Sequence, residues 1–147
     1  MDLASRPLDI WAVSDGRAGI EAQVEGLAQA VARLTPAKIT LKRIAYKGQI
    51  GRLPALLNLF PRAALTERRQ IAAPWPDLWI AAGRATLPLS IRARRWSRRK
   101  TFVVQLQDPR LPPHMFDMVI PPQHDRLAGD NVVPILGSPH RLTRERL

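Results

Sequence analysis

Short apolar runs that end in polar segments recur along the chain. An apolar run without alternation, such as residues 8–13, is typical of a strand that is covered on both faces of a sheet. If the runs are parallel strands, the polar segments lie along the carboxyl edge of one sheet, where open α/β folds bind ligands. The runs, each with the segment after it, are LDIWAV with SDGRAG, DLWIAA with GRAT, TFVVQL with QDPR, FDMVI with PPQHD, and NVVPIL with GSPHR.

The segments between several of these runs have the periodicity of helices. Apolar residues recur at helical spacing over residues 20–34, and Pro36 ends the pattern. Strands that alternate with helices predict right-handed crossovers and a parallel sheet. The predicted fold class is therefore α/β, a Rossmann-like, doubly wound, mainly parallel sheet of about six strands with helices on both faces. The expected strands are residues 8–13, 39–44 (nearer an edge), 78–82, 101–106, 116–120 and 131–136, with a further helix at 86–96.

Residues 53–60, with the sequence LPALLNLF, allow two interpretations. Arginines flank this apolar segment, so it could be a surface patch that enters a bilayer interface. More often such a stretch is a core helix with a basic exit, and we favour a short core helix here. A basic helix through Arg68 and Arg69 is expected to follow Pro61.

Composition limits the classes of protein to which the chain can belong. With 147 residues, 46% of them hydrophobic, it is long enough for one domain with a buried core. The absence of cysteine excludes disulfides and thiolate chemistry, and it fits a reducing compartment. The N-terminal sequence lacks the apolar core of a signal peptide, and no apolar run approaches the roughly 20 residues of a membrane helix. We therefore expect a cytoplasmic protein, with peripheral binding at the cytoplasmic face of a membrane as an option.

The charge of the chain predicts attraction to anions. The net charge is +11 and the isoelectric point is near 11.6, which favours nucleotides, phospholipid head groups or nucleic acid as partners. The stretch from residue 84 to residue 100 contains seven Lys or Arg and no acid, although most such runs are solvated faces. Specific nucleic-acid binding is not expected, because aromatic residues make up only 5% and no helix-turn-helix or RNP-type pattern is present.

The segment SDGRAG stands where a dinucleotide-binding fold carries G-x-G-x-x-G. Gly16 and Gly19 match the second and third glycines, but Ser14 replaces the first. Backbone amides at the start of the next helix could hold an anion, with Arg17 as a counter-charge. Asp15 disfavours pyrophosphate and could instead bind a sugar hydroxyl or act as a base. The alternative is a tight turn that needs glycine at positive φ, and NAD binding is not expected.

Further candidate ligand-binding residues follow the third and fourth expected strands. Gly83 permits close approach of a ligand to the backbone, and Arg84 at a helix start can reach a phosphate or carboxylate. After the next strand a proline stiffens the turn, so its polar side chains are presented with little loss of entropy. These side chains are Gln107, Asp108 and Arg110.

His124 and Asp125 form a candidate acid–base pair after the fifth run. Histidine titrates near neutral pH, and a neighbouring carboxylate can tune it; the alternative is a capping turn. Gln23, one turn into the first helix, could face the same sheet edge or be a solvated helix residue. No metal site is predicted, because His114, His124 and His140 form no recognised ligand pattern, and no cofactor is predicted.

Five sequence blocks, in the correct order, span nearly the whole chain: SDGRAGIEAQVEGLA, WPDLWIAAGR, VVQLQDPR, FDMVIPPQHD and GDNVVPILGSPHR. Together they resemble the family of plant elongated-mitochondria fission factors and their bacterial relatives. The resemblance implies an architecture similar to that of two-domain nucleotide-sugar glycosyltransferases of the GT-B type. It implies that residues 1–138 are the Rossmann-like N-terminal domain and that residues 139–147 start an interdomain linker, with the second domain absent.

Two functions of different classes follow from the resemblance. The first is the acceptor-side half of a GT-B-like nucleotide-sugar glycosyltransferase, inactive as a fragment. Its expected ligands are a nucleotide-sugar and a lipid-linked acceptor, and its partner is the second domain of the same parent chain. The alternative is a non-enzymatic adaptor on an anionic membrane surface, which recruits a protein partner as plant members recruit a dynamin-related fission protein.

Overall fold

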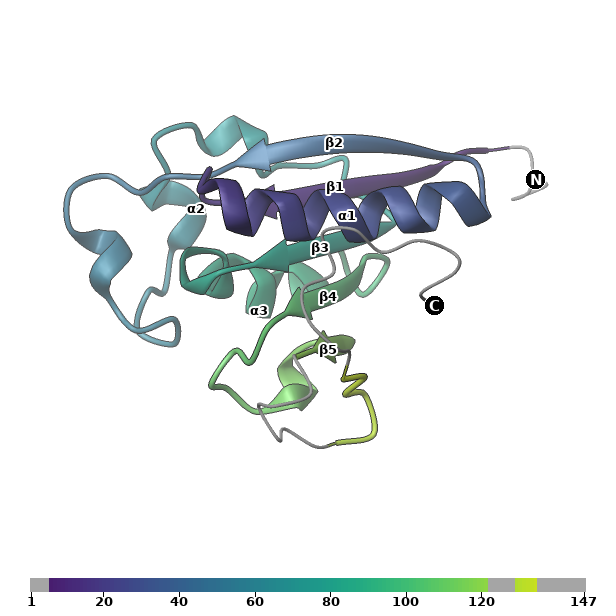
Figure 1. Ribbon diagram of the computed structural model, residues 1–147. Helices are drawn as coiled ribbons and strands as arrows, with labels where there is room; N and C mark the ends of the chain where they lie inside the picture. Colours follow the sequence, from purple (N-terminus) through teal and green to yellow (C-terminus); the bar gives the residue numbers. More distant parts are fainter. Residues whose placement is uncertain (1–5, 122–128, 135–147) are drawn as a thin grey trace.

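An open parallel sheet forms the centre of the computed structural model, which describes residues 6–121 and 129–134 (Figure 1). The strands are β1 (Leu8–Ser14), β2 (Ala37–Arg43), β3 (Leu78–Ala82), β4 (Phe102–Leu106) and β5 (Met118–Ile120). They hydrogen-bond in the order β2-β1-β3-β4-β5, and every neighbouring pair is parallel. The predicted α/β, Rossmann-like class is confirmed, with β2 at the edge where its mixed polarity placed it.

Helices cover both faces of the sheet, so the sheet is doubly wound. Helix α1 (Ala18–Leu34) crosses one face, and α2 (Pro61–Ala64) and α3 (Leu87–Trp96) lie on the other (Figure 1). No helix in the described part of the chain is long and apolar enough to cross a membrane. Short 3-10 helices occur at η2 (Ile50–Arg52), η3 (Arg68–Gln70), η4 (Arg84–Thr86) and η5 (Pro113–Met115).

The central strands are apolar on both sides because both sides are buried. In β1, Ile10 and Ala12 pack in the core beneath α1, whereas Trp11 and Val13 pack in the core on the α3 side. All four side chains are buried. This two-sided burial explains why the run shows no alternation, and it requires a helical layer on each face.

All four tryptophans of the chain form one contact series on the α3 face. The Trp11 ring lies 5.9 Å from that of Trp75 and 5.8 Å from that of Trp79, and Trp75 stacks on Trp96 at 5.7 Å. The Trp79 indole N–H, fully buried, donates to the Ser90 hydroxyl at 3.0 Å. The series therefore connects β1, β3 and α3 through large apolar ring surfaces. The polar N–H of the buried Trp79 is hydrogen-bonded, so burying it leaves no unpaired donor.

Two carboxylates fasten neighbouring strands at the amino edge of the sheet. Asp77, immediately before β3, accepts the backbone N–H of Asp9 at 2.8 Å and pairs with Arg6 at 2.9 Å. Asp117, immediately before β5, accepts the backbone N–H of Val103 at 2.7 Å. Hydrogen bonds from the Arg6 guanidinium hold the pKa of Asp77 below its ordinary value.

The predicted core helix at residues 53–60 is wrong. The segment forms turns in which the N–H groups of Leu57 and Asn58 both donate to the carbonyl of Pro54. Its four leucines and Phe60 are 43% to 78% exposed. Prolines near both ends leave too short a stretch for a helix, and no apolar partner surface covers its side chains.

Three other predictions differ in extent. In place of the basic helix expected after Pro61 and through Arg68 and Arg69, the chain forms the four-residue helix α2 and the 3-10 turn η3. Leu34, the last residue of the apolar pattern expected over residues 20–34, is exposed at the end of α1. In place of a sixth strand, the described residues contain one parallel bridge between Val119 and Val132; residues 135–147, with the predicted linker, lie outside the described part.

Replacing Asp77 by Asn should lower the free energy of unfolding at neutral pH, because it removes the charge-assisted hydrogen bonds between Asp77 and Arg6. The loss should be only about 1 kcal/mol, because this ion pair is partly exposed to solvent. The folded pKa of Asp77 lies below its ordinary value, so its stabilisation is present above that value and is lost as the pH falls through the folded pKa. The difference between native protein and variant should therefore shrink below about pH 4. Urea unfolding at a series of pH values measures it. Asp130→Asn, at an exposed position, is the control; a difference that stays constant under acid would contradict the assignment.

Candidate functional site

The carboxyl ends of β1, β3 and β4 lie side by side. The parallel register pairs Val13 with Ala81, and Ala82 with Leu106. The three polar segments that follow these strands therefore start along one edge of the sheet. This is the edge at which open α/β folds bind ligands.

A hollow of about 400 Å³ opens at this edge, beside the ends of β3 and β4. It combines guanidinium donors, side-chain amides and a carboxylate with apolar walls. The segment between η2 and α2, which is distant in sequence, supplies part of the wall. The lining residues are Pro54, Ala55, Gly83, Arg84, Leu87, Gln105, Leu106, Gln107, Asp108, Pro109, Arg110 and Leu111.

Gln105 of β4 is the least satisfied polar residue in this lining. It is 1% exposed, and its amide nitrogen donates to the Thr86 hydroxyl at 3.2 Å. Its Oε1 atom has no hydrogen-bond partner among the described residues. A buried, unpaired acceptor costs about 1–3 kcal/mol, so a partner from outside the fold is its natural explanation. Sequence reasoning missed Gln105, although a glutamine that interrupts the apolar run TFVVQL was an available signal.

The turn after β4 brings four predicted residues together in an uncommon backbone conformation. Gln107 and Arg110 have positive φ values of 70° and 55°. The Asp108 carboxylate accepts the backbone N–H of Arg110 at 2.8 Å, which fixes the turn. The Gln107 amide donates to Oε1 of Gln23 on α1 at 2.9 Å, although the two residues are 84 positions apart. Non-glycine residues with positive φ are concentrated at functional sites.

Gly83 follows β3 in a backbone conformation that favours glycine. Its φ is +90°, and an added Cβ would lie 3.4 Å from the side chain of Ile20. Any other residue would therefore be strained in its backbone here, although its Cβ would make only an ordinary contact with Ile20. The next residue, Arg84, reaches across the hollow's rim, where its guanidinium donates to the carbonyl of Arg52 at 3.3 Å.

The turn η4 behind Arg84 is held from two sides. The Tyr46 hydroxyl donates to the carbonyl of Ala85 at 2.6 Å, and the Thr86 hydroxyl donates to the carbonyl of Gly83 at 2.7 Å. Burial raises the pKa of the Tyr46 hydroxyl further above its ordinary value, so this donor stays neutral even at alkaline pH. The backbone that carries Arg84 is thus fixed before any ligand arrives.

The segment SDGRAG satisfies its polar groups internally. Ser14 is buried, and its hydroxyl accepts the N–H of Gly16, whose φ is +90°. The Asp15 carboxylate accepts both the backbone N–H of Arg17 at 3.0 Å and its side-chain Nε at 2.8 Å. Gly19 is exposed in the first turn of α1. These contacts support the tight-turn interpretation, and no residue of the segment lines the hollow.

The chemistry of the hollow is that of binding. Arg84 and Arg110 can face a phosphate or carboxylate, and amide and carboxylate oxygens can accept from hydroxyl groups. The described residues contain no group of three or more His, Asp or Glu side chains that could hold a metal ion. The candidate pair His124 and Asp125 lies outside the described residues, so its acid–base role stays a prediction.

Replacing Gln105 by Met, which has a similar length but no amide, should leave the free energy of unfolding unchanged or raise it by about 1 kcal/mol. The reason is that the change removes an unpaired buried acceptor at little cost in packing. Urea unfolding of the two proteins measures the difference. A loss of more than about 1 kcal/mol would show that Gln105 serves folding rather than a ligand.

Two curated proteins are similar to parts of the chain. The Arabidopsis thaliana mitochondrial fission protein ELM1 is 46% identical over 50 residues, which cover 34% of this chain and 12% of that protein. The uncharacterised protein RP120 of Rickettsia prowazekii (strain Madrid E) is 34% identical over 121 residues, covering 80% of this chain and 32% of that protein. The chain thus spans about a third or less of the curated relatives it matches, and no solved structure gives a significant match.

The family match extends over most of the chain. The family described as mitochondrial fission ELM1 matches residues 18–147, a range that starts at α1 and includes β2, β3, β4 and β5. The sequence resemblance and this match agree. The chain belongs to the mitochondrial fission ELM1 family.

Proposed function

We propose that the hollow at the carboxyl edge is the acceptor-side half of the ligand site in a GT-B-like nucleotide-sugar glycosyltransferase. The observation that carries the proposal is the unpaired, buried Oε1 of Gln105. Gln105 lines the hollow together with Arg84 and Arg110. A hydroxyl-rich, anionic acceptor would satisfy all three groups, because its hydroxyl can donate to Oε1 and its phosphate can face the guanidinium groups.

The contacts around the hollow suit a preorganised binding surface. Gln107 is fixed by Gln23, and Asp108 fixes the turn that carries Arg110. Arg84 is presented by a turn that Tyr46 and Thr86 hold in place. Such a surface loses little conformational entropy when a ligand binds.

The proposal assigns the base of the reaction to His124, with Asp125 as the group that tunes it. Asp15, the other candidate base, has its carboxylate engaged by Arg17 at 2.8 Å in the turn after β1. Both carboxylate oxygens already accept hydrogen bonds, one from the backbone N–H of Arg17 and one from its Nε. Asp15 is therefore better suited to shaping the turn than to accepting a proton.

The donor nucleotide is assigned mainly to a second domain that faces this edge. The described residues at the edge offer binding groups but no nucleophile with a base beside it, and SDGRAG lacks the full dinucleotide pattern. An edge with binding groups on one side is typical of one wall of an interdomain cleft. The fragment alone would then hold an acceptor without completing the reaction.

Glucose 1-phosphate, which combines hydroxyl groups with a phosphate, should bind weakly at the hollow. In a two-dimensional amide NMR titration, shifts should concentrate at Gly83, Arg84 and residues 105–111. Gln105→Met and Arg84→Ala should each weaken binding by about tenfold, because each removes a hydrogen-bonding partner worth roughly 1–2 kcal/mol. Lys38→Ala, an exposed position on β2, is the control and should bind as the native chain does. Shifts spread over the surface, or confined to SDGRAG, would contradict the proposal.

The isolated chain should bind UDP- and GDP-sugars weakly if at all, and turn none over. Calorimetry and a product assay on the 147-residue chain test this expectation. Micromolar binding with turnover would contradict the half-site proposal. The alternative function, a non-enzymatic membrane-surface adaptor, predicts instead that no sugar ligand binds at the hollow and that Gln105→Met has no functional effect.

A further inference from the structure

Exposed apolar side chains are concentrated in one segment of the described chain. Nine large hydrophobic side chains are exposed in residues 6–121 and 129–134, and six of them lie between residues 50 and 60. Leu57, Leu59 and Phe60 are 64%, 63% and 78% exposed. Exposed apolar side chains gathered in one segment mark an interaction site more often than scattered ones do.

The backbone of this segment is fastened to the body of the domain. The guanidinium of Arg92 donates to the carbonyl of Ala55 at 3.3 Å, and that of Arg84 donates to the carbonyl of Arg52. Asn58 is 3% exposed, so the middle of the segment is anchored by a buried residue. The leucines and phenylalanine of the segment are exposed, whereas Asn58 between them is buried.

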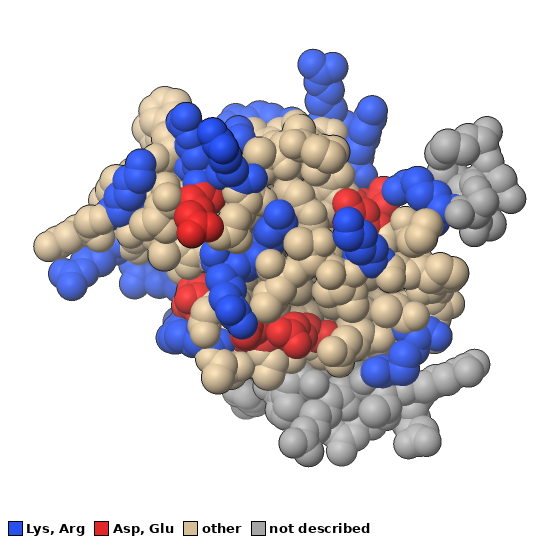
Figure 2. All heavy atoms as spheres, turned by 90° about the horizontal axis from the view of Figure 1, so that it is seen from above, with Lys and Arg blue, Asp and Glu red and all other residues tan. Residues whose placement is uncertain are grey.

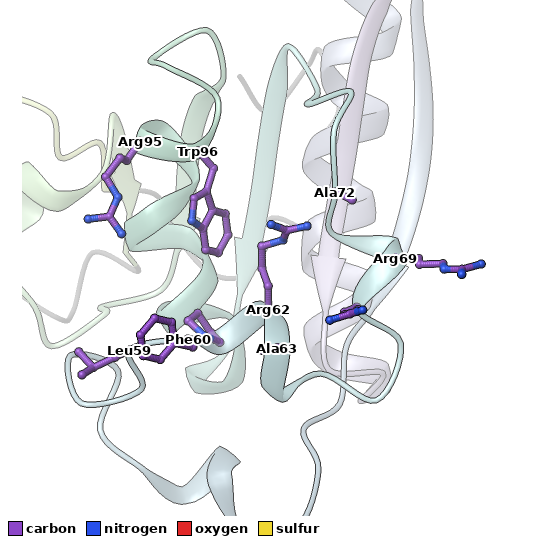
Figure 3. Close-up of a pocket in the computed structure, with 10 residues that line it drawn as sticks. Leu59, Phe60, Arg62, Ala63, Arg69, Ala72, Arg95 and Trp96 are labelled. Carbon is purple, nitrogen blue, oxygen red and sulfur yellow. The ribbon is translucent and has the colours of Figure 1, made fainter.

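An arginine-lined hollow of about 640 Å³ adjoins the same segment (Figure 3). Leu59 and Phe60 line it on one side and Trp96, at the end of α3, on another. No carboxylate is among its lining residues. The arginines that line it are Arg62, Arg68, Arg69 and Arg95.

Only one of these arginines is used by the fold. Arg62 lies over the rings of Trp75 and Trp96 at 5.5 Å and 5.6 Å, and its Nε donates to the carbonyl of Ile71. Figure 3 shows Arg62 beside Trp96, whereas Arg69 extends outward. The guanidinium groups of Arg68, Arg69 and Arg95 form no hydrogen bond or ion pair with another described residue, so their charges are available to a partner.

The positive surface continues past the end of α3. Arg95 also lines a neighbouring hollow of about 470 Å³, together with Arg94, Arg98 and Arg99. The left side of Figure 2, where the loops between β2 and α2 lie in Figure 1, carries tan side chains among several blue Lys and Arg groups, with red Asp or Glu groups between them. Apolar and basic groups are therefore adjacent on one surface.

We propose that residues 53–60 and the arginines Arg68, Arg69, Arg95, Arg98 and Arg99 form a docking surface for an anionic lipid membrane. Phosphate head groups complement unpaired guanidinium groups, and the acyl boundary takes up leucine and phenylalanine side chains. A nucleic acid would match the arginines but leave the leucines in water, since it stacks on aromatic rings. A lipid surface can contact both the arginines and the exposed leucine and phenylalanine side chains.

Vesicle co-sedimentation of the full 147-residue chain tests this docking surface. Vesicles of phosphatidylcholine with phosphatidylglycerol should bind the chain, whereas vesicles of phosphatidylcholine alone should bind it at least about tenfold more weakly. Added salt should weaken binding to the anionic vesicles because it screens the head-group charge. Leu57→Asp should lower partitioning at least about tenfold, and Arg95→Glu at least about fivefold.

Two control variants change hydrophobicity or charge away from the proposed docking surface. Leu34→Asp changes an equally exposed leucine at the end of α1, and Lys38→Glu reverses a charge on β2; both should bind nearly as the native chain does. Circular dichroism confirms that each variant is folded. Absence of vesicle binding, binding without dependence on anionic lipid, or equal losses in Leu57→Asp and Leu34→Asp would overturn the proposal. A pattern that favours nucleic acid would also overturn it. In that pattern, Leu57→Asp leaves vesicle binding unchanged and Arg95→Glu abolishes binding of single-stranded DNA.

Discussion

Burial of the central strands on both faces is the constraint on which the rest of the structure depends. Strand β1 has core residues beneath α1 and beneath α3, and β3 repeats the pattern with Ile80 on one side and Trp79 on the other. A strand buried in this way has little room for polar side chains along its length. Polar groups are therefore displaced to the two edges of the sheet, and the two edges use them differently.

The two carboxylates at the amino edge are paired, whereas one buried oxygen at the carboxyl edge is not. At the amino edge, Asp77 and Asp117 each accept a backbone N–H of the neighbouring strand, so the carboxylates contribute to register and stability. At the carboxyl edge, Gln105 leaves a buried oxygen unpaired, and Gln107 and Arg110 hold a positive φ. An unpaired buried acceptor and two residues with positive φ are local costs that a binding site at this edge would explain.

The sequence predicts this architecture well because one signal, the unbroken apolar run, follows directly from two-sided burial. The runs at residues 78–82 and 101–106 match β3 and β4 to within a residue. The same signal fails at residues 53–60, because apolar composition cannot tell a side chain that is covered from one that lacks a cover. The apolar-run signal also missed Gln105, because this residue lies within a predicted strand. It also cannot show that Gln107 pairs with Gln23, because the two residues are far apart in sequence.

Residues 53–60 connect the two surfaces for which we propose ligands. Pro54 and Ala55 line the hollow at the carboxyl edge, while Leu59 and Phe60 line the arginine hollow beside α3. Because the backbone between them is fastened by Arg92, docking of Leu57 and Phe60 in a lipid interface would hold the edge hollow at a fixed, short distance from the head groups. An acceptor whose sugar is attached to a membrane lipid presents its hydroxyls and phosphate in that layer. The exposed segment would then orient the domain at the membrane before such an acceptor binds. This would raise the effective concentration of the acceptor at the hollow without adding a contact in the hollow itself.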